Sequence, residues 1–210
     1  IVKTMHVFYS ENYGNPHSHT HMKGINANLE IEKSRQKIAN YFNAPKEGVV
    51  FTSGATESNN LAITGYIKKA KKDGINRKKV FCSAVEHKCV LECIQNAKVY
   101  DLEAHILKVD SQGKLDLDYA QKYIDEDTLL VSIMATNNET GIDLQIEEIG
   151  KMCNDNGVFF HSDIAQSLHH KLFDIENSFI DIVSISGHKI YGPKGVGALI
   201  CKEEPILNLE

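Results

Sequence analysis

The sequence predicts an α/β fold in which a mainly parallel, mixed β-sheet is flanked by helices. Short apolar, β-branched runs that are typical of buried strands alternate with segments whose apolar residues recur at helical spacing. This alternation indicates βαβ units and a mainly parallel sheet. No internal repeat or flexible linker divides the 210 residues, so we expect one domain spanning residues 1–210.

Each element has its own signal in the sequence. The strands are the short runs rich in Val, Ile, Leu and Phe, expected at residues 49–52, 80–82, 105–109, 129–134, 158–161, 182–185 and 197–201. The helices have apolar residues three or four apart, and they are expected at residues 26–42, through 61–67, and at 87–97, 116–124 and 146–156. Gly157 provides a stop for the last helix.

Composition and charge exclude some classes of protein. The formal net charge is −5, whereas a dedicated nucleic-acid-binding domain usually has a basic face. A lysine-rich run between Lys68 and Lys79 is either such a face or a solvated helix end and loop, and we favour the second interpretation. No apolar stretch approaches the ~20 residues that span a bilayer. We therefore expect a soluble protein with no nucleic-acid partner and no membrane partner.

The cysteines do not predict a disulfide framework or a metal site. There are five, an odd number, and no C-x-x-C pair occurs among them. Reduced thiols inside the cell are the expectation. Cys89 and Cys93 lie four residues apart on a predicted helix, so we expect them to pack in the core.

Polar residues follow the ends of several predicted strands. Carboxyl ends of parallel strands meet at one edge of the sheet, where ligands bind in open α/β sheets. The polar groups expected there are Ser53 to Thr56, Glu86-His87, Asn137-Asn138, Asp163 to Gln166 and Ser186 to Lys189.

The first of these loops has features of an anion site. Gly54 allows a tight turn, and the helix that follows presents free N–H groups at its positive end. Small hydroxyl-bearing residues at that point suit a phosphate. Helix capping by Ser53 or Thr56 explains the same pattern, and the loop alone leaves both open. It lacks the G-x-x-x-x-G-K-[ST] pattern of nucleoside-triphosphate sites.

Two further strand ends carry an acid and an imidazole. Asp163 follows an apolar strand, where a carboxylate needs a partner: a cationic ring nitrogen of a bound cofactor, a helix N-terminus or a salt bridge. His87 opens a predicted helix, where it either stacks on a flat aromatic ligand or caps the helix.

Lys189 lies in a glycine-rich segment after the apolar run 182–185. We expect the strand to shield it from solvent, and a desolvated amine is a nucleophile for an aldehyde. Ser186 and His188 flank it and are suited to hold a phosphate. An ordinary charged residue in a turn between two strands is the alternative. The joint placement of these groups in sheet order favours a site.

Together these stretches resemble the large domain of NifS/IscS-type cysteine desulfurases, in the class V aminotransferase group of pyridoxal-phosphate (PLP) enzymes. The matching stretches are residues 14–16, 51–61, 86–88, 137–141, 161–167 and 186–195, in family order over nearly the whole chain. The resemblance implies the large-domain fold of type I PLP transferases and PLP as the cofactor.

The resemblance also implies roles around the cofactor ring. Lys189 forms the Schiff base with PLP and moves protons at the substrate α-carbon. Asp163 pairs with the pyridine nitrogen, and Gln166 bonds the phenolic oxygen. His87 stacks on the ring and takes part in proton transfer. Asn138 lies near the ring oxygen and the substrate carboxylate.

For the phosphate, the resemblance implies contacts from the backbone of Ala55 and from Thr56, Ser186 and His188. The implied reaction converts L-cysteine to L-alanine and leaves sulfur as a persulfide for iron–sulfur cluster or thio-cofactor assembly. A sulfur-acceptor or scaffold protein, a homodimer, and a cytoplasmic or mitochondrial location are implied with it.

Some features of the family are not expected within residues 1–210. They are its N-terminal segment and its smaller C-terminal domain, which carries the persulfide-forming cysteine and an arginine for the substrate carboxylate. The isolated chain is therefore expected to be inactive. Ser162 and Ile164 depart mildly from the usual neighbours of the aspartate. A selenocysteine lyase of the same family and a catalytically incomplete PLP-fold binding module are the alternatives.

Overall fold

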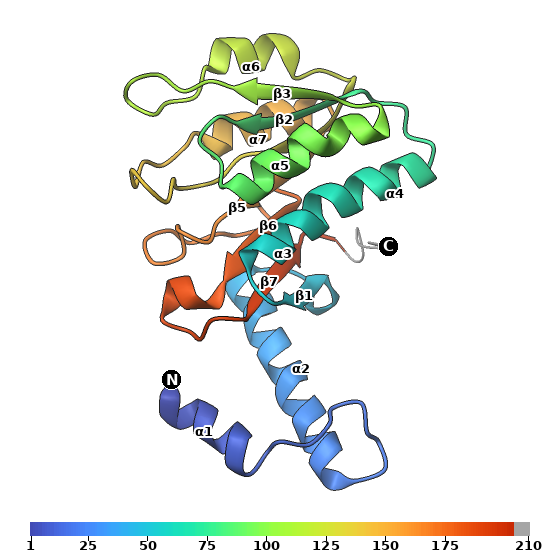
Figure 1. Ribbon diagram of the computed structural model, residues 1–210, viewed down its shortest axis with the longest axis vertical. Coiled ribbons are helices and arrows are strands. Elements are labelled where there is room, and N and C mark those ends of the chain that lie inside the picture. Colours follow the sequence, from blue (N-terminus) through green and yellow to red (C-terminus); the bar gives the residue numbers. More distant parts are fainter. Residues whose placement is uncertain (204–210) are drawn as a thin grey trace.

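A seven-stranded sheet forms the centre of the protein in a computed structural model that describes residues 1–203 (Figure 1). Its strand order is β1 (Val49–Thr52), β7 (Gly197–Cys201), β6 (Ile182–Ser186), β5 (Phe159–Asp163), β4 (Thr128–Ser132), β2 (Lys79–Ser83) and β3 (Glu103–Leu107). Strand β7 is antiparallel to both neighbours, and every other pairing is parallel. The prediction of a mixed, mainly parallel sheet is confirmed.

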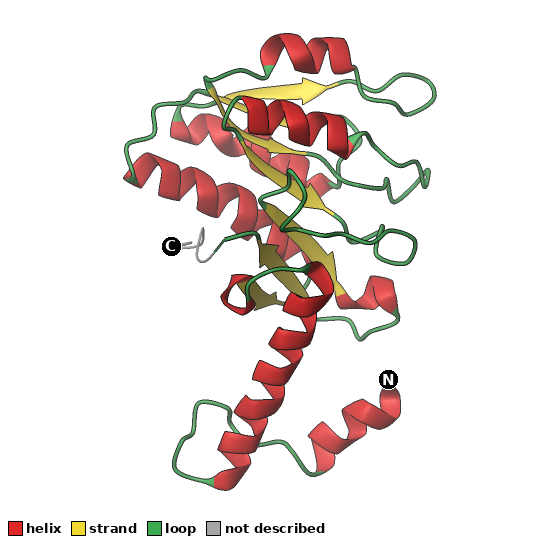
Figure 2. Ribbon diagram, turned by 180° about the vertical axis from the view of Figure 1, so that it is seen from behind, coloured by secondary structure: helices red, strands yellow, loops and turns green. Residues whose placement is uncertain are grey.

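Helices cover both faces of this sheet (Figure 2). On one face lie α3 (Ala55–Asn60), which continues through a π-helical segment (Leu61–Gly65) into α4 (Tyr66–Lys72), and α5 (Lys88–Asn96). On the other face lie the end of α2 (Met22–Phe42), α6 (Leu117–Tyr123) and α7 (Ile146–Asp155).

The alternation of side chains along each strand builds two hydrophobic cores. On β2, Phe81 packs in the core on the α7 side, whereas its neighbours Val80 and Cys82 pack in the core on the α5 side. Cys89 and Cys93 belong to the α5-side core, as expected, and all five cysteines are buried and free.

Several observed bounds differ from the predicted ones: the helix predicted at 26–42 begins at Met22, and the strand predicted at 158–161 lies at 159–163. The strand predicted at residues 105–109 lies at 103–107, because Val109 leaves the sheet to form a bridge with Leu115. The strand predicted at 129–134 lies at 128–132. Short 3-10 helices occur at Lys46–Gly48, Ala97–Tyr100 and Gly187–Ile190.

The first helix, α1 (Val2–Ser10), and the start of α2 project away from the sheet and its helices (Figure 1). Helix α1 has no buried residue. Within residues 1–203, no helix is both long and apolar enough to cross a membrane.

The lysine-rich run forms a helix end and loop, as favoured. Lys69 forms an ion pair with Asp73, and Lys79 lies 2.6 Å from Asp125. Arg77 donates to the Thr128 carbonyl.

Candidate functional site

One cleft of about 460 Å³ lies at the carboxyl ends of the parallel strands, where polar groups were predicted from the sequence. It is lined by every residue predicted for the site: Ala55, Thr56, His87, Asn138, Asp163, Gln166, Ser186, His188 and Lys189. Segments far apart in the chain therefore meet at one place, and the roles of the individual residues stay predictions.

The anion-site loop opens α3 without a side-chain cap. Gly54 is the N-cap residue, with φ 154° and ψ 177°, a conformation that is essentially restricted to glycine. Ser53 does not cap the helix, because its N–H and hydroxyl donate to Glu57 Oε2 at 2.7 and 2.6 Å. The capping interpretation is wrong for Ser53, and no side chain accepts from the first N–H groups of this described helix.

The β6 end supplies further anion-binding groups. The hydroxyl of Ser186 hydrogen-bonds with His188 Nδ1 at 2.9 Å. A Cβ on Gly54 would lie 3.9 Å from Ser186 Oγ, so the two loops are adjacent. Helix N–H groups, a hydroxyl and an imidazole together suit a phosphate.

Close backbone packing holds these two loops together. A Cβ on Gly197 of β7 would lie 2.6 Å from both Gly54 Cα and the Ile185 carbonyl oxygen. No side chain fits between backbone atoms at that distance. Gly197 therefore lets β7 pass directly against the anion-site loop.

Asp163 ends β5 and is only 7% exposed. Its Oδ1 accepts from the Ala165 N–H at 2.9 Å, and its Oδ2 accepts from Asn59 Nδ2 at 2.7 Å. Burial raises the pKa of Asp163, while these hydrogen bonds and the nearby His87 and Lys189 oppose the rise. A buried carboxyl of this kind is suited to pair with a cationic group in the cleft.

His87 both caps a helix and lines the cleft, so the two interpretations of this residue are compatible. It is the N-cap residue of α5, and its Nδ1 accepts from the Cys89 N–H at 3.3 Å. Cys89 Sγ lies 3.0 Å from the same nitrogen. An Nδ1 that accepts from the backbone places the proton of the neutral ring on Nε2.

Lys189 lies in the cleft, but the expectation that it is shielded from solvent is wrong in the structure. Strand β6 ends at Ser186, which is buried, and the chain continues into the 3-10 helix Gly187–Ile190. Lys189 lies in this helix and not in the buried strand. Lys189 lines the cleft and is exposed to solvent.

Several residues that line the cleft were not predicted: Asn59, Cys89, Met134, Thr136 and Lys194. Conversely, Asn137 points away, because its Nδ2 donates to the Val85 carbonyl at 2.9 Å and its Oδ1 accepts from the N–H of Thr140. Glu86 is buried and does not line the cleft.

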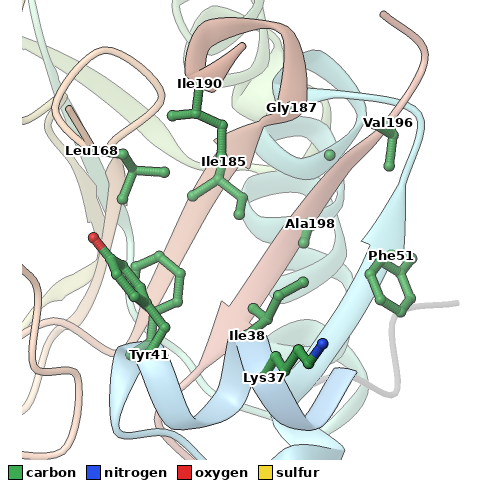
Figure 3. A pocket seen from close by; sticks show the side chains of 12 residues that line it. Lys37, Ile38, Tyr41, Phe51, Leu168, Ile185, Gly187, Ile190, Val196 and Ala198 are labelled. Atoms are coloured by element: carbon green, nitrogen blue, oxygen red, sulfur yellow. The ribbon is translucent and has the colours of Figure 1, made fainter. Parts of the chain in front are cut away.

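A second cavity, of about 440 Å³, lies between the end of α2 and strands β6 and β7 (Figure 3). Side chains such as Ile38, Ile185 and Ile190 give it an apolar wall, and only Lys37 and Tyr41 bring polar side-chain atoms. It offers no cluster of acids, imidazoles or hydroxyls for chemistry, so the first cleft is the candidate site.

The model of the family described as aminotransferase class-V matches residues 1–210. The chain is 44% identical over 210 residues to the mitochondrial cysteine desulfurase of Candida albicans, covering 100% of the chain and 42% of that protein. It is 42% identical over 205 residues to the cysteine desulfurase IscS of Rickettsia felis, covering 98% of the chain and 49% of that protein. The chain thus spans less than half the length of either relative.

A solved structure shows the same fold. The chain superposes with a TM-score of 0.88 on a protein described as NifS-like, at 36% sequence identity, covering 96% of this chain and 55% of that one. The family match extends over the whole chain and agrees with the fold. The chain therefore belongs to the aminotransferase class-V family of PLP-dependent enzymes.

Proposed function

We propose that the protein containing this chain is a PLP-dependent cysteine desulfurase, and that residues 1–210 are its PLP-binding large domain. The observation that carries the proposal is the single cleft that brings together the nine residues predicted for the cofactor and the chemistry. The names of the similar proteins, cysteine desulfurases of mitochondria and bacteria, support the choice of reaction within the family.

The groups present in the cleft fit PLP. Its phosphate end matches the uncapped start of α3 and the hydroxyl and imidazole of Ser186 and His188. The buried Asp163 matches a protonated pyridine nitrogen, and Lys189 supplies an amine for the aldehyde. The imidazole of His87 is a flat surface on which an aromatic ring can stack.

Each residue then has a physical task. When bound, PLP supplies an electron sink for negative charge at the substrate α-carbon. Asp163 would keep the ring nitrogen protonated, and His87 would cover the ring. Lys189 would bind the aldehyde carbon and move the proton at the substrate α-carbon. Gln166 would bond the phenolic oxygen, and Asn138 would lie near that oxygen and the substrate carboxylate. Ala55 (through its backbone) and Thr56 would complete the phosphate contacts.

The overall reaction balances with one protein thiol. L-Cysteine and the thiol yield L-alanine and a persulfide: the Cβ–S bond breaks, the sulfur joins the thiol, and Cβ keeps the electron pair and gains a proton. The five cysteines of this chain are buried, and burial raises the pKa of Cys82, Cys153 and Cys201. We therefore place the persulfide on a cysteine other than these.

We further propose a homodimer, a sulfur-acceptor or scaffold protein as partner, and a location in mitochondria or in bacterial cytoplasm. The arm formed by α1 and the start of α2 supports the dimer, because it exposes Val2, Tyr9 and Met22 at 80%, 75% and 67%. Exposed apolar surface of this kind is typical of protein interfaces.

The test uses the full-length protein. Borohydride reduction of the PLP-loaded protein should attach the cofactor to Lys189, located by peptide mass spectrometry, and the protein should release alanine from L-cysteine. Lys189→Ala should abolish both, whereas Lys151→Ala, an exposed lysine of α7, should change neither. Cofactor attached to another lysine would refute the proposed site, and activity on selenocysteine alone would refute the proposed reaction.

A further inference from the structure

Asn59 is a fully buried amide in the wall of the cleft, and its position connects the two ends of the candidate site. It is 0% exposed and lies on α3, four residues after Ala55. Residues four apart share a helix face, so the face that begins at the anion-site loop also reaches Asp163.

The Asn59 side chain is hydrogen-bonded to two groups of the cleft. Its Nδ2 donates to Asp163 Oδ2 at 2.7 Å and to Cys89 Sγ at 3.4 Å. The same Cys89 sulfur lies 3.0 Å from His87 Nδ1. One amide therefore contacts the acid expected at the pyridine nitrogen and, through Cys89, the imidazole expected over the ring.

The carboxyl group of Asp163 has few other hydrogen-bond partners that fix its orientation. Among the described residues, the Ala165 N–H donates to Oδ1 and the Asn59 amide donates to Oδ2. The titratable groups that act on this carboxyl are His87, Lys189, and the buried Glu86 and Cys89. Loss of the amide would leave a buried oxygen without a donor, which favours protonation and rotation of the carboxyl.

We propose that Asn59 is a positioning residue that holds Asp163 in the orientation in which it receives the pyridine nitrogen of PLP. The α3 helix thereby ties the phosphate end of the cleft to its acid end. This inference rests on the proposed PLP site, and its test includes a measurement without cofactor.

The experiment compares Asn59→Leu, which keeps the number and branching of the side-chain heavy atoms without a donor, with Asn60→Leu, whose exposed side chain does not line the cleft. In the cofactor-free full-length protein, infrared titration of the Asp163 carboxyl, assigned with Asp163→Asn, should show a raised pKa in Asn59→Leu only. Titration with PLP should show binding weaker by about tenfold or more in that variant, the effect of losing a buried hydrogen bond to a charged group.

Unchanged titration and unchanged PLP affinity in Asn59→Leu would overturn the inference. If this variant does not fold, Asn59→Ser, which is too short to reach Asp163, decides in the same way. Failure of the wild-type protein to bind PLP would instead overturn the proposed function, and the infrared titration would still decide the role of Asn59.

Discussion

Replacing Glu86 by glutamine should make the protein more stable at alkaline pH than at acid pH, relative to the wild type. Glu86 is 6% exposed, and its Oε1 accepts from the Ser83 hydroxyl at 2.6 Å and the Met134 N–H at 2.8 Å. Its Oε2 is buried with no partner among the described residues. A neutral carboxyl suits these surroundings, and Glu86→Gln keeps the accepting oxygen while removing the charge.

The magnitude follows from proton linkage. Burial raises the pKa of Glu86 from 4.5 to about 8, so the folded protein keeps a proton that the unfolded chain loses above pH 4.5. The associated stability is present below pH 4.5 and is lost as the pH rises toward 8. At about 1.4 kcal/mol per pH unit, the loss reaches about 5 kcal/mol by pH 8.

Urea unfolding of the cofactor-free protein, followed by circular dichroism at pH 5.5, 6.5, 7.5 and 8.5, measures the effect. The difference in unfolding free energy between Glu86→Gln and the wild type should grow in favour of the variant at each step. Glu126→Gln, at an exposed position, is the matched control and should show no such trend. A pH-independent difference for Glu86→Gln would show that Glu86 is ionised in the fold and refute the reasoning.

Two further predictions concern the backbone and a buried imidazole. Gly197→Ala should destabilise the protein by about 1–3 kcal/mol and weaken PLP binding, because the added methyl group would lie 2.6 Å from Gly54 Cα and the Ile185 carbonyl oxygen. Urea unfolding and PLP titration measure the two effects. A variant that behaves like the wild type in both assays would contradict the close approach of these backbones. His161 is fully buried and hydrogen-bonds with Ser132 at 2.8 Å, and burial lowers its pKa from 6.5 to about 3. As the pH falls, the unfolded chain therefore binds a proton at His161 before the folded protein does, which destabilises the wild type. Between pH 6.5 and 5, the unfolding free energy of the wild type should fall by about 2 kcal/mol more than that of His161→Gln. The same urea unfolding assay measures this difference.

The sheet and the polar groups at its carboxyl edge were predictable, because strand patterns and the geometry of parallel strands are local or general properties. Asp163 is an example, because an acid directly after an apolar strand can be placed at the carboxyl edge of the sheet from the sequence alone. Asn59 and Cys89 were not recognised, because their approach to the cleft depends on how the helices rotate against the sheet. The shielding expected for Lys189 failed, because the chain turns outward one residue after the strand, and nothing in the apolar run before it specifies that turn.

The pairing of β1 with β7 determines how early the cleft can form during synthesis and folding. Val49 pairs with Ile200, so the strand that leads into the Gly54 loop is synthesised well before the strand with which it pairs. Contacts between such distant segments close late in folding. During synthesis the β1 edge must therefore wait for almost the entire domain. Formation of the complete cleft therefore requires that synthesis has passed β7 and that β7 has paired with β1.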